Sequence, residues 1–193
     1  MKKIALFASG SGTNAAAIME HFAGSDLAHA ALVLSNRPDA YVLTRAGERG
    51  VPAETFSREV LYGDPQLILR ILDRYGIDFI VLAGFMLLMP REIVEKYAGR
   101  IVNIHPALLP KYGGKGMYGD RVHRAVIAAG EKESGITIHY VNERYDEGDI
   151  ISQYRLEVFP GETPDTLAER IHALEHRWYP QVIEQTIMKN EMI

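Results

Sequence analysis

Short apolar runs alternate with segments of helical periodicity along the first two thirds of the chain, and this alternation predicts an α/β fold. Strand-like runs lie at 3–9, 29–36, 78–85 and 100–105, with a weaker one at 52–56. Apolar residues at helical spacing predict helices over 14–22, 38–50, 65–75 and 90–98. Fully apolar strands separated by helices indicate a parallel sheet that is covered on both faces.

The pattern changes after residue 133. Two strand-like segments, 135–141 and 149–159, follow each other across a short link, which predicts an antiparallel pair added to the sheet. Residues 164–189 form a long amphipathic pattern, with Thr163 as its expected cap and Pro180 as an expected kink or break. We therefore expect one domain over residues 1–193, a single doubly wound, mostly parallel sheet with a C-terminal antiparallel strand pair and a long closing helix.

Composition narrows the function classes. The chain has 193 residues, 47% of them hydrophobic and 24% charged, with a net charge of −4 and no cysteine. It therefore has no disulfide framework, no thiolate nucleophile and no cysteine zinc site. The longest apolar run, FIVLAGFMLLMP, is too short for a membrane span, and we see no signal peptide and no basic block. We expect a cytoplasmic protein that acts on small molecules, with no nucleic acid and no membrane, as a monomer or homodimer.

A glycine-rich turn, SGSGTNA, follows the first strand at residues 9–15. It matches the loose dinucleotide pattern G-x-G-x-x-A at Gly10, Gly12 and Ala15. Glycines let the backbone approach an anion, and the first N–H groups of the next helix point toward it. Asn36 ends the second strand, where a NAD site has an acidic residue. A single phosphate therefore fits the turn best, with an unliganded turn and an NAD(P) site as alternatives.

An amide and an imidazole end the fifth strand. Asn103 and His105 are two residues apart, so in a strand they face the same way, at the end where open α/β sheets bind ligands. Pro106 and Pro110 keep the following segment out of a helix. A carboxamide N–H can stabilise an oxyanion and an imidazole can exchange protons near neutral pH, so the pair suits acyl transfer. The alternative is a hydrogen-bonded pair that only anchors a loop.

A carboxylate is needed to tune the imidazole, and the link between the last two strands offers two. Asp146 is the first choice and Asp149 competes with it, and the sequence alone does not rank them. His139 lies on a strand face from which it can also reach the site. A metal site made of His105, His139 and Asp146 stays open, although no closely spaced ligand pair supports it.

The motifs together resemble a known family. The segment NIHPALLPKY, residues 103–112, resembles the N-I-H-P-S-L-L-P signature of the folate-dependent formyltransferases. SGSGTN, LAGFM and YDEGDII occur around it in the family's order, and the similarity covers essentially the whole chain. Within the family, the chain resembles the enzymes that act on glycinamide ribonucleotide. The resemblance implies transfer of a formyl group from the co-substrate 10-formyltetrahydrofolate to the ribonucleotide's primary amine in de novo purine biosynthesis, without a metal.

The resemblance also implies roles for individual residues. Asn103 is the expected oxyanion donor, His105 the acid and base, and Asp146 the carboxylate that raises the pKa of His105 and helps relay the proton. The implied ribonucleotide-binding residues are Gly12, Thr13, Asn14 and Glu175. The implied folate-binding residues are Arg58, Met86, Leu87, Leu88, Met89 and Asn103.

Three departures from the family pattern affect these expectations. Leu87 stands where relatives often have an arginine, which removes a polar folate contact. The segment 111–123 is longer than usual, and Lys111, Lys115 and Arg121 in it are candidate phosphate contacts or plain surface. Asp149 stands where proline is common.

Other functions account for only part of the sequence. A methionyl-tRNA formyltransferase would need a further RNA-binding domain and a basic face. A formyltetrahydrofolate hydrolase would need an extra N-terminal domain. A non-catalytic nucleotide-binding module, or an NAD(P) oxidoreductase, would use the glycine turn alone.

Overall fold

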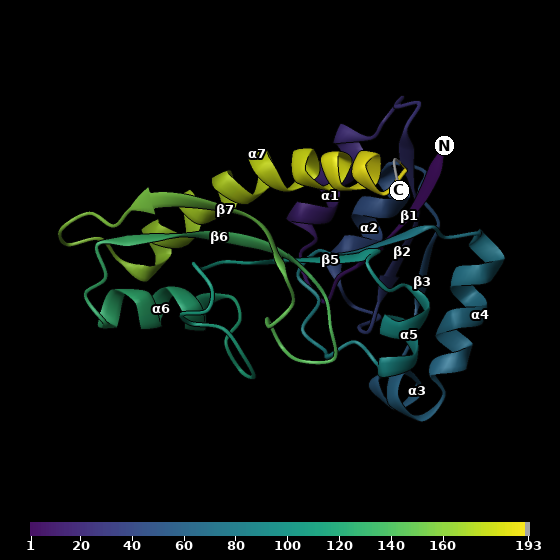
Figure 1. Ribbon diagram of the computed structural model, residues 1–193, viewed down its shortest axis with the longest axis horizontal. Helices are drawn as coiled ribbons and strands as arrows, with labels where there is room; N and C mark the ends of the chain where they lie inside the picture. The colour runs from purple at the N-terminus through teal and green to yellow at the C-terminus, as the bar shows by residue number, and fades with distance from the viewer. Residues whose placement is uncertain (192–193) are drawn as a thin grey trace.

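The computed structural model describes residues 1–191, and it forms the expected α/β architecture (Figure 1). Seven strands form one sheet in the order β3-β2-β1-β4-β5-β6-β7. Their bounds are β1 Lys2–Phe7, β2 Ala28–Ser35, β3 Ala53–Thr55, β4 Phe79–Leu82, β5 Ile101–His105, β6 Glu133–Tyr140 and β7 Ile150–Glu157. Strands β1 to β5 pair in parallel, and β6 and β7 are antiparallel to their neighbours. The predicted fold class is confirmed.

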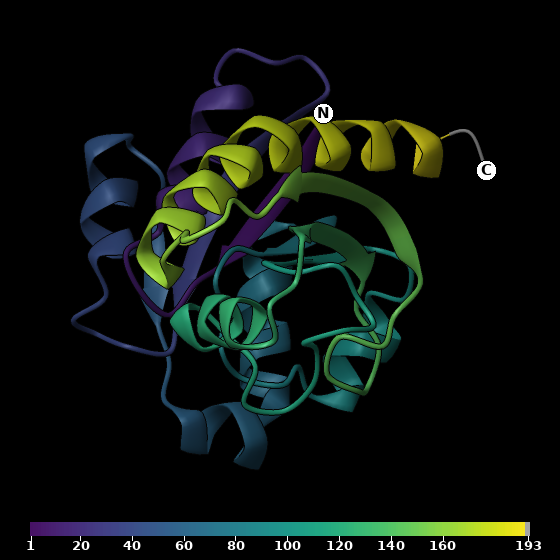
Figure 2. The same cartoon turned by 90° about the vertical axis from the view of Figure 1, so that its left-hand side faces the viewer.

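Helices cover both faces of the sheet. Their bounds are α1 Thr13–His21, α2 Tyr41–Glu48, α3 Arg58–Gly63, α4 Pro65–Tyr75, α5 Arg91–Lys96, α6 Asp120–Ala128 and α7 Pro164–Glu191. One buried apolar cluster joins the sheet to α1, α2, α6 and α7, and the other joins it to α3, α4 and α5. Figure 2 shows α7 passing beside α1, in agreement with their many contacts.

Successive side chains along the central strands point alternately into the two apolar clusters. In β1, Ile4 and Leu6 belong to the first cluster, while Ala5 and Phe7 belong to the second. All four side chains are fully buried, so the continuous apolar run in the sequence reflects a strand covered on both faces. The strand order reverses between β1 and β4, and at such a switch point the carboxyl ends of the strands leave a crevice.

The closing helix begins as the sequence predicts but does not break. The Thr163 hydroxyl accepts a hydrogen bond from the N–H of Thr166 at 3.2 Å, so the expected cap is confirmed. The sequence predicts a kink or a break at Pro180, and the break is wrong because the helix continues through this residue. Its 28 residues pack along α1, α6 and the sheet, and this packing holds the helix together across the proline. Neither α7 nor any other helix within residues 1–191 is long and apolar enough to cross a membrane.

Two helices were not predicted from the sequence. Helix α3 begins at Arg58 and is capped by Ser57, whose hydroxyl accepts from the N–H of Val60 at 3.2 Å. Helix α6 takes the second part of the segment 111–123 that was expected to be a loop, and it buries Val122 and Val126 one turn apart. Strand β4 also ends three residues before the expected position 85, because the chain turns at Gly84 with φ of 79°.

Candidate active site

A cavity of about 630 Å³ opens at the carboxyl ends of β1, β4 and β5, where the strand order reverses. Segments from across the chain line it, including the glycine turn, the residues after β4, the end of β5 and part of α7. It brings together every residue to which the family resemblance assigns a role: Gly12, Thr13, Asn14, Arg58, Met86, Leu87, Leu88, Met89, Asn103, His105, Asp146 and Glu175.

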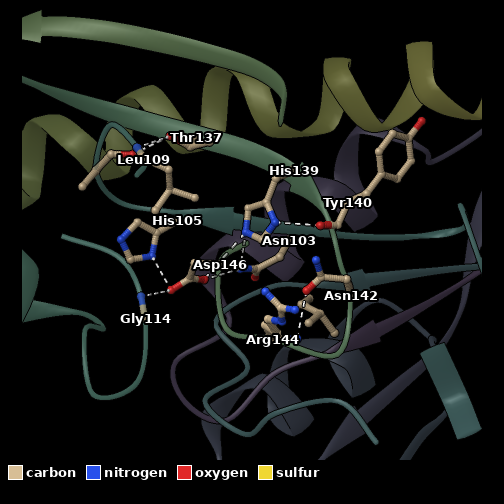
Figure 3. Close-up of polar contacts among 12 residues, drawn as sticks. Asn103, His105, Leu109, Gly114, Thr137, His139, Tyr140, Asn142, Arg144 and Asp146 are labelled. Carbon is tan, nitrogen blue, oxygen red and sulfur yellow. Dashed lines mark hydrogen bonds and ion pairs between the residues drawn. The ribbon is translucent and has the colours of Figure 1, made fainter. Parts of the chain in front are cut away.

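The amide and the imidazole at the end of β5 face the same cavity, as their spacing predicts. Val102 and Ile104 point into the apolar cluster under α7, while Asn103 and His105 line the cavity on the opposite side of the strand. Figure 3 shows the carboxylate of Asp146 between the two side chains. The pair is therefore presented to a ligand.

Asp146 is the carboxylate that reaches this pair, and Asp149 is exposed outside the cavity. One oxygen of Asp146 accepts from the Gly114 N–H at 2.9 Å and lies 3.6 Å from Nδ1 of His105. The other lies 3.5 Å from the amide nitrogen of Asn103. The Asp146 backbone has φ of 57°, a left-handed conformation that aspartate adopts more readily than most residues.

The ring of His105 is held by one nitrogen, which leaves the other for chemistry. Nε2 lies 2.7 Å from the carbonyl oxygen of Tyr112, an acceptor only, so Nε2 carries the hydrogen and donates it. In the neutral ring the lone pair is then on Nδ1, the nitrogen that faces Asp146. The His105 side chain is 4% exposed, so the anchoring bond is shielded from water.

Burial and neighbouring groups act in opposite directions on the pKa values of His105 and Asp146. The pKa of His105 lies below its ordinary value because burial disfavours the imidazolium, and the Asp146 carboxylate opposes this effect without cancelling it. The expected upward effect of Asp146 on this pKa is therefore present, but burial has the larger effect. Burial also acts to raise the pKa of Asp146, yet its pKa ends below the ordinary range because His139, His105 and Gly114 stabilise the charged form.

His139 reaches the site and orients Asn103. Its Nδ1–H donates to the Tyr140 carbonyl at 2.8 Å, so its Nε2 accepts from the Asn103 amide at 3.1 Å. This contact fixes which end of the Asn103 carboxamide carries the donors, and it turns the second N–H toward Asp146 (Figure 3). Among residues 1–191, no group of three histidine, aspartate or glutamate side chains is arranged to hold a metal ion, so the open metal alternative has no support in the geometry.

The glycine turn packs closely and leads into α1. Gly12 has φ of 73°, and a Cβ there would overlap the Val42 side chain and lie 2.9 Å from its Cα, so only glycine fits. Asn14 in the first turn of α1 donates to Glu175 at 2.8 Å. Glu175 is 5% exposed, so it is not a solvated helix charge, and burial raises the pKa of its carboxyl group.

The strip after β4 forms an apolar wall. Met86 is exposed, Leu87 and Leu88 are half-buried, and Met89 is buried in the apolar cluster under α4. Met89 therefore contributes mainly to the core. Arg58, at the start of α3, is exposed at the rim of the same cavity.

The long segment after the signature contributes one of its three basic candidates to the cavity. Lys115 lines the wall. Lys111 instead pairs with Glu131 at 2.8 Å, and Arg121 lies over the Tyr118 ring, 5.1 Å from its centroid. Lys111 and Arg121 are therefore surface residues.

Several wall residues were missed from the sequence. They are Tyr118, His123, Arg144, Tyr145 and His172. His172 lies three residues before Glu175 in α7, so the helical spacing identifies it as a neighbour on the same face. His123 had no such signal because α6 itself was not predicted.

Comparison with known proteins agrees with this geometry. The family described as formyl transferase matches residues 2–183. A phosphoribosylglycinamide formyltransferase of Bacillus subtilis is 41% identical over 194 residues, covering 98% of this chain and 97% of the relative. A chloroplastic phosphoribosylglycinamide formyltransferase of Arabidopsis thaliana is 42% identical over 187 residues, and the chain spans 64% of its length.

Solved structures give the same result. Glycinamide ribonucleotide transformylase 1 from Geobacillus kaustophilus superposes with a TM-score of 0.88 at 41% identity, covering 97% of this chain and 99% of that one. Its counterpart from Symbiobacterium toebii gives a TM-score of 0.89 at 35% identity, over 98% of this chain and 89% of that one. The chain therefore belongs to the formyl transferase family.

Proposed function

We propose that this protein transfers the formyl group of 10-formyltetrahydrofolate to the primary amine of glycinamide ribonucleotide, a step of de novo purine biosynthesis. The observation that carries the proposal is the meeting of the Asn103 amide, the His105 imidazole and the Asp146 carboxylate in one cavity with the glycine turn. Family membership and the names of the most similar relatives support the same reaction.

The reaction exchanges one carbon–nitrogen bond for another. The ribonucleotide amine attacks the formyl carbon, a tetrahedral oxyanion forms, and the bond from that carbon to the folate nitrogen N10 breaks. The amine loses a proton and N10 gains one, so the overall transfer needs no outside oxidant or metal. The protein must therefore hold an oxyanion and move a proton.

His105 moves the proton in this proposal. Its neutral ring carries a lone pair on Nδ1, which accepts the amine proton and later returns it to N10. The imidazolium that forms lies 3.6 Å from the Asp146 carboxylate, which stabilises it at that moment. The lowered pKa keeps the free ring in the base form at neutral pH.

Asn103 holds the oxyanion. One of its N–H groups is committed to His139, and the other makes only a long contact of 3.5 Å with Asp146. A developing negative charge replaces that long contact with a stronger bond. Such a donor contributes about 2.7–4 kcal/mol where it has been removed from other enzymes.

The glycine turn holds the ribonucleotide. The phosphate lies at the N-terminus of α1, where the N–H groups of Gly12, Thr13 and Asn14 are available to an anion. Glu175, buried beside Asn14, is placed to accept from ribose hydroxyls. The folate lies on the apolar strip Met86 to Met89, with Asn103 at its formyl end and Arg58 at the rim for a carboxylate.

We further propose that residues 1–193 work as one domain in the cytoplasm, on small molecules and without nucleic acid, as a monomer or homodimer. The lack of cysteine and of any basic block supports this setting.

A coupled assay tests the proposed reaction. The protein is mixed with glycinamide ribonucleotide and 10-formyltetrahydrofolate, and release of tetrahydrofolate is followed with each substrate omitted in turn. We expect turnover only when both are present. The variant Asp146→Asn should lose most turnover, whereas the matched control Asp149→Asn, in the same loop, should retain it. Nucleotide binding without turnover would favour a non-catalytic module, and a fluorescence change on adding NAD(P) would favour an oxidoreductase.

A further inference from the structure

A second cavity, of about 640 Å³, lies outside the candidate active site, in a groove between α1, α2 and α7. We name it the helical groove. Its titratable lining residues are Glu20, His21, Arg45, Arg49, His176 and Arg177. Thr13 lines both this groove and the catalytic cavity, so the two sites meet at the first residue of α1.

The helical groove is positively charged in a chain whose net charge is −4. Its lining contains three guanidinium groups, two imidazoles and one carboxylate, Glu20, while Glu48 and Glu184 lie close by outside the lining. His21 is paired with Glu184 at 3.1 Å, and Arg49 lies 3.6 Å from Glu48. Among the side chains of residues 1–190, no carboxylate lies within 4.0 Å of the guanidinium of Arg45 or Arg177. The guanidinium groups of Arg45 and Arg177 are therefore available to bind an anion in the groove.

Two of these cations are already oriented. The Nε–H of Arg45 donates to the Ser11 carbonyl at 2.9 Å, and Nη1 of Arg49 donates to the Arg45 carbonyl at 3.2 Å. Arg45 is also held over the Tyr41 ring, 5.0 Å from its centroid. Fixing long side chains in advance lowers the entropy cost of binding a ligand.

Arg45 in the groove and His172 one turn earlier in α7 both disfavour the imidazolium of His176. Burial lowers the pKa of His176 first, and His172 and Arg45 lower it further by repulsion. A bound anion would relieve this repulsion and favour the imidazolium.

We propose that the helical groove is a second anion site, one that binds a phosphate group, either free phosphate or the phosphate of a nucleotide. The volume suits a ligand as large as a nucleotide. Because Arg45 holds the Ser11 carbonyl, occupancy of the groove also changes affinity at the glycine turn. This coupling rests on the proposed function, whereas the anion site itself does not.

Titration of the intact protein tests the site. Inorganic phosphate and adenosine monophosphate are titrated separately by calorimetry, while NMR follows the His176 ring resonances, first without and then with saturating glycinamide ribonucleotide. We expect phosphate to bind in both cases and to raise the pKa of His176. The double variant Arg49→Gln/Arg177→Gln should bind at least about tenfold more weakly, since it loses two charge-assisted contacts. Arg155→Gln, an exposed arginine of β7, is the matched control and should bind normally.

The two probes separate the possible sources of the anion. Tighter binding of adenosine monophosphate identifies a nucleotide site, and equal binding identifies a phosphate site; both support the proposal. Unchanged affinity in the double variant, or loss of all phosphate binding when the ribonucleotide is present, would place the anion at the glycine turn and overturn it. Failure of the formyl-transfer assay with the groove titration intact would contradict only the proposed function and the coupling.

Discussion

The two ends of the catalytic cavity are built differently. At the glycine turn, recognition depends on the backbone, on close packing of Gly12 against Val42 and on one buried carboxylate. At the end of β5, it depends on ionisable side chains whose hydrogens are fixed by carbonyl groups of Tyr112 and Tyr140. The difference indicates that substrate binding and proton transfer are separable here, so changes at each end should affect different kinetic constants.

The largest effect should follow removal of the imidazole. We predict that His105→Ala lowers kcat by about 10²–10⁴-fold, the usual contribution of a general acid and base, with a smaller change in KM for the ribonucleotide. Steady-state kinetics with both substrates varied measures this, and thermal unfolding checks that the fold survives. If His105→Ala kept a near-normal kcat, proton transfer would not depend on the end of β5, and the two ends of the cavity would not differ in function.

A change at the other end should act on binding and stability. We predict that Gly12→Ala destabilises the protein by about 2–4 kcal/mol, since it combines an unfavourable φ with overlap against Val42. It should also raise KM for the ribonucleotide more than it lowers kcat. Denaturant unfolding measures the first effect, with Gly10→Ala as control because a Cβ there meets nothing within 4 Å. Equal stability of the two variants would show that the close approach is not needed.

A change at Arg58, on the rim of the cavity, should alter the kinetic constants less than a change at either end. We predict that Arg58→Gln raises KM for 10-formyltetrahydrofolate by about tenfold, the loss expected for one charge-assisted hydrogen bond, and leaves KM for the ribonucleotide unchanged. Initial rates at varied folate concentration test this. An increase in the KM for the ribonucleotide instead would assign Arg58 to the wrong substrate.

The smallest expected effect is a shift in the pH at which activity falls on the acid side. Burial lowers the pKa of His105, so its base form persists below the ordinary value of about 6.5 and the acid limb of kcat/KM should fall below that pH. Asp146 raises this pKa, so Asp146→Asn should move the acid limb of the residual activity further down. A pH–rate profile of both proteins measures the shift. An acid limb above 6.5 in the unaltered protein would contradict the assignment.

The same shifts determine the sign of the acid response of stability. Unfolding returns His105 to its higher ordinary pKa, so the unfolded chain binds more protons between the two values and stability falls as the pH falls through that window. Asp146 acts in the same direction at lower pH, because its folded pKa is depressed and its contribution is lost as the carboxylate is protonated.

Most of the fold follows from local patterns. Periodicity predicts the fully buried strands and the shared facing of Asn103 and His105, and the residue type at position 163 predicts the helix cap. Helix α6 did not follow, because its turn of Val122 and Val126 is preceded by a glycine-rich stretch that resembles a loop. The choice of Asp146 over Asp149 and the role of His139 depend on how β6 and β7 meet β5, a long-range packing outcome. The net pKa of His105 depends on burial, which a strand-end position does not predict.

The carbonyl of Tyr112 has a consequence beyond anchoring a ring. It decides which of two interconvertible tautomers the protein maintains, and it belongs to a residue with φ of 58° outside any helix or strand. A substitution that rotated that single peptide would leave every reactive group in place and yet divide the molecules between an active and an idle form. Catalytic activity therefore depends on the backbone conformation of a surface segment that contains no reactive group.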